Sequence, residues 1–263
     1  MHLSRVLDIE DKEDKEDKAL MAVSVVTLNI EGDKHFSRFI PVLQQLQPEV
    51  FCVQEVFEVD LPRIRTALGI PEENCLFLPM TNMASENKYN ISPRGPWGVA
   101  LLTTLQHSGA QKKYYKGSGT TPLFTTPNSV DRGLLCTKVS KGTDSLLICT
   151  THFTWTGDGQ SSPEQQRDFV ALKETVAEFP SHVLCGDFNS PRGGEIFSLF
   201  TTIYQDGLPA RVTTTIDGSL HYAGNLELAV DTAFYQQPLQ VEVHQILEGV
   251  SDHKGISFLV RVA

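Results

Sequence analysis

The sequence lacks the features that mark several common protein classes. It has no uninterrupted run of about 18 apolar residues and no apolar signal-like stretch near residue 1, so we expect no transmembrane segment and no secretion signal. It has no serine elbow, no glycine-rich phosphate loop and no Cys-x-x-Cys pair. These absences remove a serine nucleophile, a phosphate cradle and a zinc ribbon from the candidate chemistries.

An excess of positive charge is also missing. The formal net charge is −10, which argues against a basic surface that coats nucleic acid. A nuclease stays possible, because a bound metal ion supplies positive charge at the reaction centre itself.

The chain has few cysteines, and their number, five, is odd. Cys52, Cys149 and Cys185 lie in apolar runs typical of strands, so we expect them to be reduced core residues. Reduced cysteines favour a reducing, intracellular compartment, either cytoplasmic or nuclear.

Composition divides the chain into two segments. Residues 1–20 include a run of alternating Asp, Glu and Lys at 11–18, which predicts a charged, flexible N-terminal tail. The length and the 40% hydrophobic content of the chain predict that residues 21–263 form one domain, which we expect to act as a monomer.

Hydrophobic patterning predicts many strands and few helices. Helical spacing and capping signals indicate helices at 36–46, 61–68, 163–179 and 190–200, with Ser162 as the N-cap of the third. Apolar and β-branched runs predict strands at 23–30, 50–56, 76–78, 98–105, 133–139, 146–151, 182–185, 228–235, 240–245 and 255–262. This order predicts two packed sheets with helices outside.

Two polar segments interrupt these elements. The polar composition of residues 79–97 predicts a loop of the kind that carries specificity. Residues 108–128 predict a hairpin arm or a long loop, and its Lys-Lys-Tyr-Tyr-Lys sequence at 112–116 has two interpretations. The arm could meet a phosphate backbone and stack bases, or it could be a solvated hairpin.

Polar side chains follow the apolar strands at several separate places. A buried, unpaired carboxylate is costly, so such residues need a partner, and a divalent metal beside a phosphate ester is one. Asn29 and Glu31 are two apart, as are Asp187 and Asn189, and this spacing places each pair on one strand face. The other strand-end residues are Glu55, His152, Asp231, Asp252 and His253.

These motifs, in this order, resemble the endonuclease/exonuclease/phosphatase superfamily, with the deoxyribonuclease I-like fold. The matching pieces are Asn29-Ile30-Glu31-Gly32, Gln54-Glu55-Val56, Thr151-His152-Phe153, Gly186-Asp187-Phe188-Asn189 and Ser251-Asp252-His253. The resemblance spans residues 22–262 and implies an α/β fold. That fold is a four-layer α/β sandwich, with two mainly antiparallel β-sheets packed face to face and helices outside.

The resemblance also implies a metal centre and an activated water. Glu55, with Asn29 beside it and Asp252 in the same shell, would hold Mg²⁺ or Mn²⁺. Asp187 would orient or deprotonate the attacking water, and Asn189 would position that water or the phosphate.

The phosphate contacts follow from the same resemblance. His253, held by Asp231, would contact the phosphate and stabilise its developing charge, and His152 would contact it from the other side. Arg132 stands where some relatives carry a phosphate-binding arginine, and the other interpretation is an arginine on the surface.

The expected activity is that of a metal-dependent phosphodiesterase or nuclease, with nucleic acid or another phosphodiester as substrate. Tyrosyl-DNA phosphodiesterases and polyadenylate deadenylases are two branches it resembles. The alternative is a phosphatase or phosphodiesterase on a small-molecule or lipid ester, such as a sphingomyelinase-like or inositol-phosphate-like enzyme. An inactive binding module is disfavoured, because every catalytic residue type is present.

Overall fold

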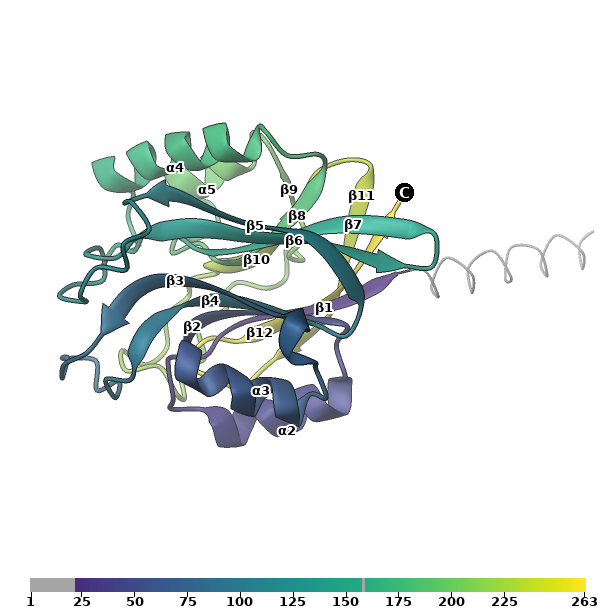
Figure 1. The fold of residues 1–263 in the computed structure, drawn as a ribbon. Helices are drawn as coiled ribbons and strands as arrows, with labels where there is room; N and C mark the ends of the chain where they lie inside the picture. Colours follow the sequence, from purple (N-terminus) through teal and green to yellow (C-terminus); the bar gives the residue numbers. More distant parts are fainter. Residues whose placement is uncertain (1–21, 158) are drawn as a thin grey trace, which may run out of the picture.

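The structure is a computed structural model of the chain, and it describes residues 22–157 and 159–263. Two six-stranded sheets lie face to face, with helices on both outer faces (Figure 1). This is the expected four-layer α/β sandwich. The charged segment predicted at residues 1–20 lies outside the described residues.

The first sheet has the strand order β11-β12-β1-β2-β4-β3. Only β1 and β2 pair in parallel, and the other neighbours are antiparallel. Its strands are β1 (Val23–Asn29), β2 (Val50–Phe57), β3 (Cys75–Met83), β4 (Gly95–Thr103), β11 (Leu239–Leu247) and β12 (Gly255–Val262).

The second sheet has the order β5-β6-β7-β8-β10-β9, and β7 and β8 are its one parallel pair. Its strands are β5 (Gln106–Lys116), β6 (Arg132–Lys141), β7 (Asp144–His152), β8 (His182–Asp187), β9 (Gln205–Asp206) and β10 (Asp231–Tyr235). The prediction of two mainly antiparallel sheets is confirmed.

The helices cover the outer faces of the sheets (Figure 1). The first sheet is covered by α2 (Phe36–Leu46) and α3 (Leu61–Ala67), and the second by α4 (Pro163–Val176) and α5 (Glu195–Phe200). Two short 3₁₀ turns, η1 (Glu58–Asp60) and η2 (Glu72–Asn74), flank α3. None of the described helices has the length and the apolar character that a membrane span requires.

Local signals account for the helix ends. Ser162 caps α4, because its side chain accepts a hydrogen bond from the Gln165 amide at 3.1 Å. The helix expected from residue 190 begins only at Glu195. The preceding backbone is not helical, since Asn189 has a φ of 48° and Gly194 precedes the first turn in an extended conformation.

The segment expected as an arm or long loop begins as a strand. β5 pairs with β6 along an edge of the second sheet. Tyr115 is buried and its hydroxyl lies 3.0 Å from Thr151 Oγ1, while the Tyr114 hydroxyl donates to the Pro79 carbonyl at 2.7 Å. Neither ring is free to stack a base, so the interpretation in which this segment stacks bases is wrong, and a loop begins only at residue 117. The loop expected at 79–97 is also shorter, because β3 continues to Met83 and β4 begins at Gly95.

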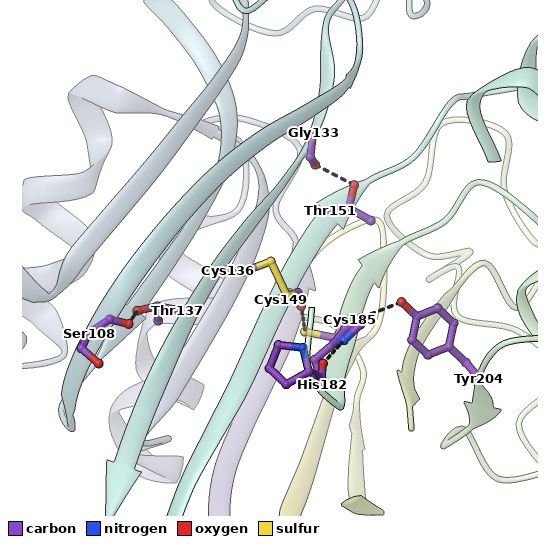
Figure 2. Close-up of a disulfide and its surroundings, with 10 residues drawn as sticks. Ser108, Gly133, Cys136, Thr137, Cys149, Thr151, His182, Cys185 and Tyr204 are labelled. Atoms are coloured by element: carbon purple, nitrogen blue, oxygen red, sulfur yellow. Dashed lines mark hydrogen bonds between the residues drawn. A yellow bond between two sulfur atoms is a disulfide. The ribbon is translucent and has the colours of Figure 1, made fainter. Parts of the chain in front are cut away.

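The cysteine prediction is also wrong at one position. Cys136 and Cys149 are register partners on β6 and β7, and they form a disulfide (Figure 2). The bridge lies on the side of the second sheet that packs against Phe169 of α4. Sequence spacing does not reveal this antiparallel pairing, and the argument for a reducing compartment loses one of its residues. Cys52 and Cys185 are free and buried between the two sheets.

Candidate active site

The strand ends of both sheets meet at one cleft of about 120 Å³. β1, β7 and β8 end there, and Asp252 and His253, in the turn before β12, lie there as well. The charged and polar residues that line the cleft are Glu31, Glu55, Arg132, His152, Asp187, Asn189, His221, Asp252 and His253. Of the site residues expected from the sequence, Asn29 and Asp231 lie one contact behind this lining.

Asp187 is the centre of the cleft floor. Its Oδ2 accepts a hydrogen bond from Asn29 Nδ2 at 3.1 Å, and its Oδ1 accepts one from the Asn189 amide at 2.8 Å. The same Oδ2 lies 3.5 Å from His152 Nε2 and 3.9 Å from His253 Nε2. The carboxylate therefore stands between two imidazoles, with its orientation fixed by two amide groups.

His253 is held by a buried chain of hydrogen bonds. Its Nδ1 lies 2.8 Å from Asp231 Oδ2, and Thr215 Oγ1 donates to the same carboxylate oxygen at 2.7 Å. Burial alone would lower the pKa of His253, but the charges of Asp231 and Asp187 raise it well above its usual value. The imidazole is thus held as a cation facing the floor of the cleft.

Thr215 was not among the residues predicted from the sequence. Its hydroxyl also accepts the amides of Val230 and Asp231, each at 3.0 Å, so it fixes the start of β10. Thr215 stands in a run of three threonines, 213–215, and no local pattern separates it from its neighbours.

Glu55 reaches the cleft through an irregularity in β2. The register shifts between Gln54 and Val56, and Glu55 has a φ of 59°. Burial, with a further contribution from the charge of Asp252, raises the pKa of Glu55 to about 8. A divalent cation would relieve this unfavourable burial of carboxylates.

Three further side chains near Glu55 form a group of potential metal ligands. Ligand atoms of Glu31, His35 and Asp252 all lie within 4.8 Å of one another. His35 Nε2 is 3.0 Å from Glu31 Oε2, and Lys34 also contacts Glu31. Carboxylate oxygens suit Mg²⁺ or Mn²⁺, so this donor set and Glu55 fit the expected ion. The motif at residues 29–32 identified Glu31 as a site residue, whereas no sequence pattern pointed to His35.

The spacing argument for shared strand faces fails at both pairs. β1 ends at Asn29 and β8 ends at Asp187, and the next site residue of each pair lies in a turn. Glu31 has a φ of 51° and Asn189 one of 48°. With Glu55, they make three of the six non-glycine residues with positive φ in the described part of the chain. Such strained backbone is typical of functional sites.

His152 and Arg132 form the other side of the floor. Burial, and then the charge of Arg132, lowers the pKa of His152 to about 3, so this imidazole is neutral. Arg132 is 1% exposed and donates to the His152 carbonyl at 3.0 Å and the Pro127 carbonyl at 2.8 Å. Its Nε and His152 Nδ1 have no hydrogen-bond partner among the described residues. A buried cation beside an uncharged imidazole suits an anionic ligand.

Two residues beneath the site hold the strands together, Gln54 between the two sheets and Gly186 within the second sheet. Gln54 Nε2 donates to Thr27 Oγ1 at 3.1 Å in the first sheet and to Thr150 Oγ1 at 3.0 Å in the second. Gly186 has a φ of 142°, and a Cβ there would lie 2.1 Å from the Thr151 carbonyl oxygen. The glycine before Asp187 therefore allows β7 and β8 to run close together under the cleft.

Comparison with known proteins gives a consistent result. A model of the Endonuclease/Exonuclease/phosphatase family matches residues 26–253. No curated protein matches the chain significantly in sequence.

Solved structures share the fold at low sequence identity. The human nocturnin catalytic domain is 16% identical with a TM-score of 0.65, over 92% of this chain and 94% of that chain. A mannosyl-6-phosphatase of Bacteroides thetaiotaomicron is 12% identical with a TM-score of 0.66, over 91% and 99%. D. rerio TDP2, humanized by 14 mutations, is 14% identical with a TM-score of 0.62, over 92% and 100%.

Proposed function

The chain belongs to the endonuclease/exonuclease/phosphatase family, and from this membership and its cleft we propose a metal-dependent phosphodiesterase that acts on nucleic acid. The observation that carries the proposal is the placement of Asp187. Its carboxylate is aimed between the neutral His152 and the cationic His253, each within 3.9 Å. A base beside a cationic group can activate water and stabilise the charge that develops during hydrolysis of a phosphoester.

We assign the roles by charge state. Asp187 accepts a proton from a water that attacks phosphorus, a P–O bond forms, and the P–O bond to the leaving group breaks. His253, kept protonated by Asp231, stabilises the charge on the phosphoryl oxygens. Arg132 adds a buried positive charge beside His152, on the other side of the floor.

The carboxylates Glu31, Glu55 and Asp252 would hold Mg²⁺ or Mn²⁺. When bound, the ion neutralises charge on the phosphoryl group. The raised pKa of Glu55 and its proximity to Asp252 support this assignment, because a bound divalent cation would offset the repulsion between these buried carboxylates.

A second candidate is a phosphatase or phosphodiesterase on a small-molecule ester. It is favoured by the position of the Lys-Lys-Tyr-Tyr-Lys segment, whose tyrosines pack inward and whose Lys113 and Lys116 contact Glu178 and Glu164. One solved structure of the same fold is named a mannosyl-6-phosphatase.

The test is turnover of a substrate panel with Mg²⁺, with EDTA, and with Mg²⁺ restored. The panel contains single- and double-stranded DNA, RNA, a 5′-tyrosyl oligonucleotide, sphingomyelin and an inositol phosphate. We expect cleavage of an oligonucleotide that EDTA stops and Mg²⁺ restores. Activity that survives complete chelation would remove the metal from the proposal, and turnover of only the lipid or inositol ester would establish the second candidate.

A further inference from the structure

The cleft has a second wall that the proposed chemistry does not use. Beside the charged floor, Met83, Ile91 and Trp97 line the cleft and pack in one buried cluster with Phe57. The half-buried rings of Tyr89 and Phe124 pack against this cluster and also line the cleft. The aromatic wall, defined here as Tyr89, Trp97 and Phe124, comes from β4 and the loops that follow β3 and β5.

The rings of the aromatic wall are arranged edge to face and reach the catalytic floor. Phe124 lies 6.2 Å from Tyr89 and 6.4 Å from Trp97 between ring centroids. Trp97 in turn lies 5.9 Å from the His152 imidazole. A flat group held against the wall would therefore lie next to a phosphate on the floor.

Another aromatic side chain stands at the cleft in open solvent. Tyr222 lines the cleft while its side chain is 77% exposed, and its ring lies 4.6 Å from that of His221. The segment is anchored by Asp217, whose amide donates to the Asp252 carbonyl at 2.8 Å and whose Oδ2 accepts from the Gly249 amide at 2.6 Å. A large exposed ring on an anchored segment is a surface that a ligand can cover.

Two polar atoms of the aromatic wall have no partner. Trp97 Nε1–H and the Tyr89 hydroxyl are buried, and neither makes a hydrogen bond to any described residue. Buried donors are normally satisfied, so an unsatisfied pair beside a cleft indicates a ligand with hydrogen-bond acceptors. A nucleobase carries acceptors on its ring, whereas an alkyl chain carries none.

We propose that the aromatic wall and Tyr222 form a subsite for one unpaired nucleobase of the substrate. The base would lie between Phe124 and Tyr222, with its edge toward Tyr89 and Trp97 and its phosphate on the floor. A base whose edge is read in this way is not available for pairing, so the substrate is a single-stranded or terminal nucleotide rather than intact duplex. The inference rests on the proposed function for its phosphate end.

The test is binding rather than turnover. Calorimetry in EDTA measures the dissociation constants of adenosine 5′-monophosphate and of ribose 5-phosphate, which carries the same phosphate without a base. Repulsion between the phosphate and the carboxylates of the cleft affects both ligands equally, so it cancels in the ratio of the two constants. We expect the nucleotide to bind roughly 5- to 150-fold more tightly, as base stacking on aromatic side chains predicts. Equal affinity of the two ligands would overturn the subsite, and so would tighter binding of hexyl phosphate than of the nucleotide.

Variants locate the preference on the wall. Tyr222→Ala and Phe124→Ala should each reduce the ratio, and Tyr89→Phe should reduce it less, because it removes only a hydroxyl. Tyr222 is exposed, so its variant keeps the test valid if Phe124→Ala fails to fold. Val170→Ala, at a position of α4 that is 53% exposed and outside the cleft, is the matched control. A ratio unchanged in both alanine variants places the base elsewhere.

The two proposals fail separately. Metal-dependent turnover of the panel together with a ratio near one keeps the proposed function and removes the subsite. A nucleotide preference that the wall variants abolish, in a protein that cleaves no phosphoester, keeps the subsite and removes the proposed function.

Discussion

The two ends of β8 are equally buried and are built in opposite ways. At its start, His182 is completely buried and both ring nitrogens have partners. Nδ1 lies 2.8 Å from the Pro180 carbonyl, and Nε2 lies 2.6 Å from the Tyr204 hydroxyl (Figure 2). These partners define a neutral ring, with Nδ1–H donating to Pro180 and Nε2 accepting from Tyr204.

At its end, the same strand lies among crowded polar groups that are only partly satisfied by the described residues. Asp187 is 1% exposed, the pKa of the nearby Glu55 is raised to about 8, and His152 Nδ1 has no partner among the described residues. The comparison teaches that burial alone does not mark a functional residue. Satisfied polar groups stabilise a fold, whereas a crowded, unsatisfied set is retained for chemistry at a cost in stability.

The largest effect should come from Asp187→Asn, which changes the end of β8 that lies in the cleft, here called the functional end. Asparagine keeps one acceptor oxygen for the Asn29 and Asn189 amides, turns an NH₂ donor toward the other, and is not a base, so we expect turnover to fall by about 10²- to 10⁴-fold. The free energy of unfolding should fall by about 1–3 kcal/mol, because one buried amide donor loses its acceptor and His253 loses a neighbouring negative charge. Steady-state kinetics and urea unfolding measure the two quantities.

The matched control for that change is Asp144→Asn at the start of β7, outside the cleft. It should leave turnover unchanged. Near-wild-type turnover in Asp187→Asn would remove Asp187 from the mechanism.

Much of the functional end was predictable, because strand ends are local features. Asp187 follows an apolar run and a glycine, and parallel pairing of β7 with β8 then places it opposite His152. The same holds for the fold, since alternating apolar runs and capped helices fix two sheets with outer helices.

The rest depends on contacts between distant segments. Thr215 acts on Asp231 across 16 positions, and His35 joins Asp252 only in the folded chain. The turns after Asn29 and Asp187 replaced the strand alternation that the spacing implied. The aromatic wall collects residues from three segments, and no periodicity links them.

A smaller effect should come from Gly186→Ala, which tests the backbone that supports the functional end. The new Cβ would meet the Thr151 carbonyl oxygen at 2.1 Å in a backbone conformation that disfavours side chains. Overpacking and left-handed strain together predict a loss of roughly 2–5 kcal/mol in the free energy of unfolding, measured in urea.

Gly193→Ala is the control for that strain. Gly193 also has a positive φ, 85°, but nothing lies within 4 Å of the position of its Cβ. It should lose only the conformational part, about 1–2 kcal/mol. Equal losses in both variants would show that the close approach of β7 and β8 carries no energy of its own.

The smallest effect should appear at the start of β8, where His182 should make stability depend on pH. Burial lowers the pKa of His182 below its usual 6.5, so the unfolded chain binds a proton there before the folded one does. As the pH falls from about 7 to about 5, His182 should therefore lower the free energy of unfolding. Replacing it in His182→Gln should make the fall in Tm shallower by a few degrees at most. Part of the slope should remain, because His152, with its pKa of about 3, has the same sign. If the slope of Tm against pH is unchanged in His182→Gln, protonation of His182 does not contribute to the pH dependence of stability.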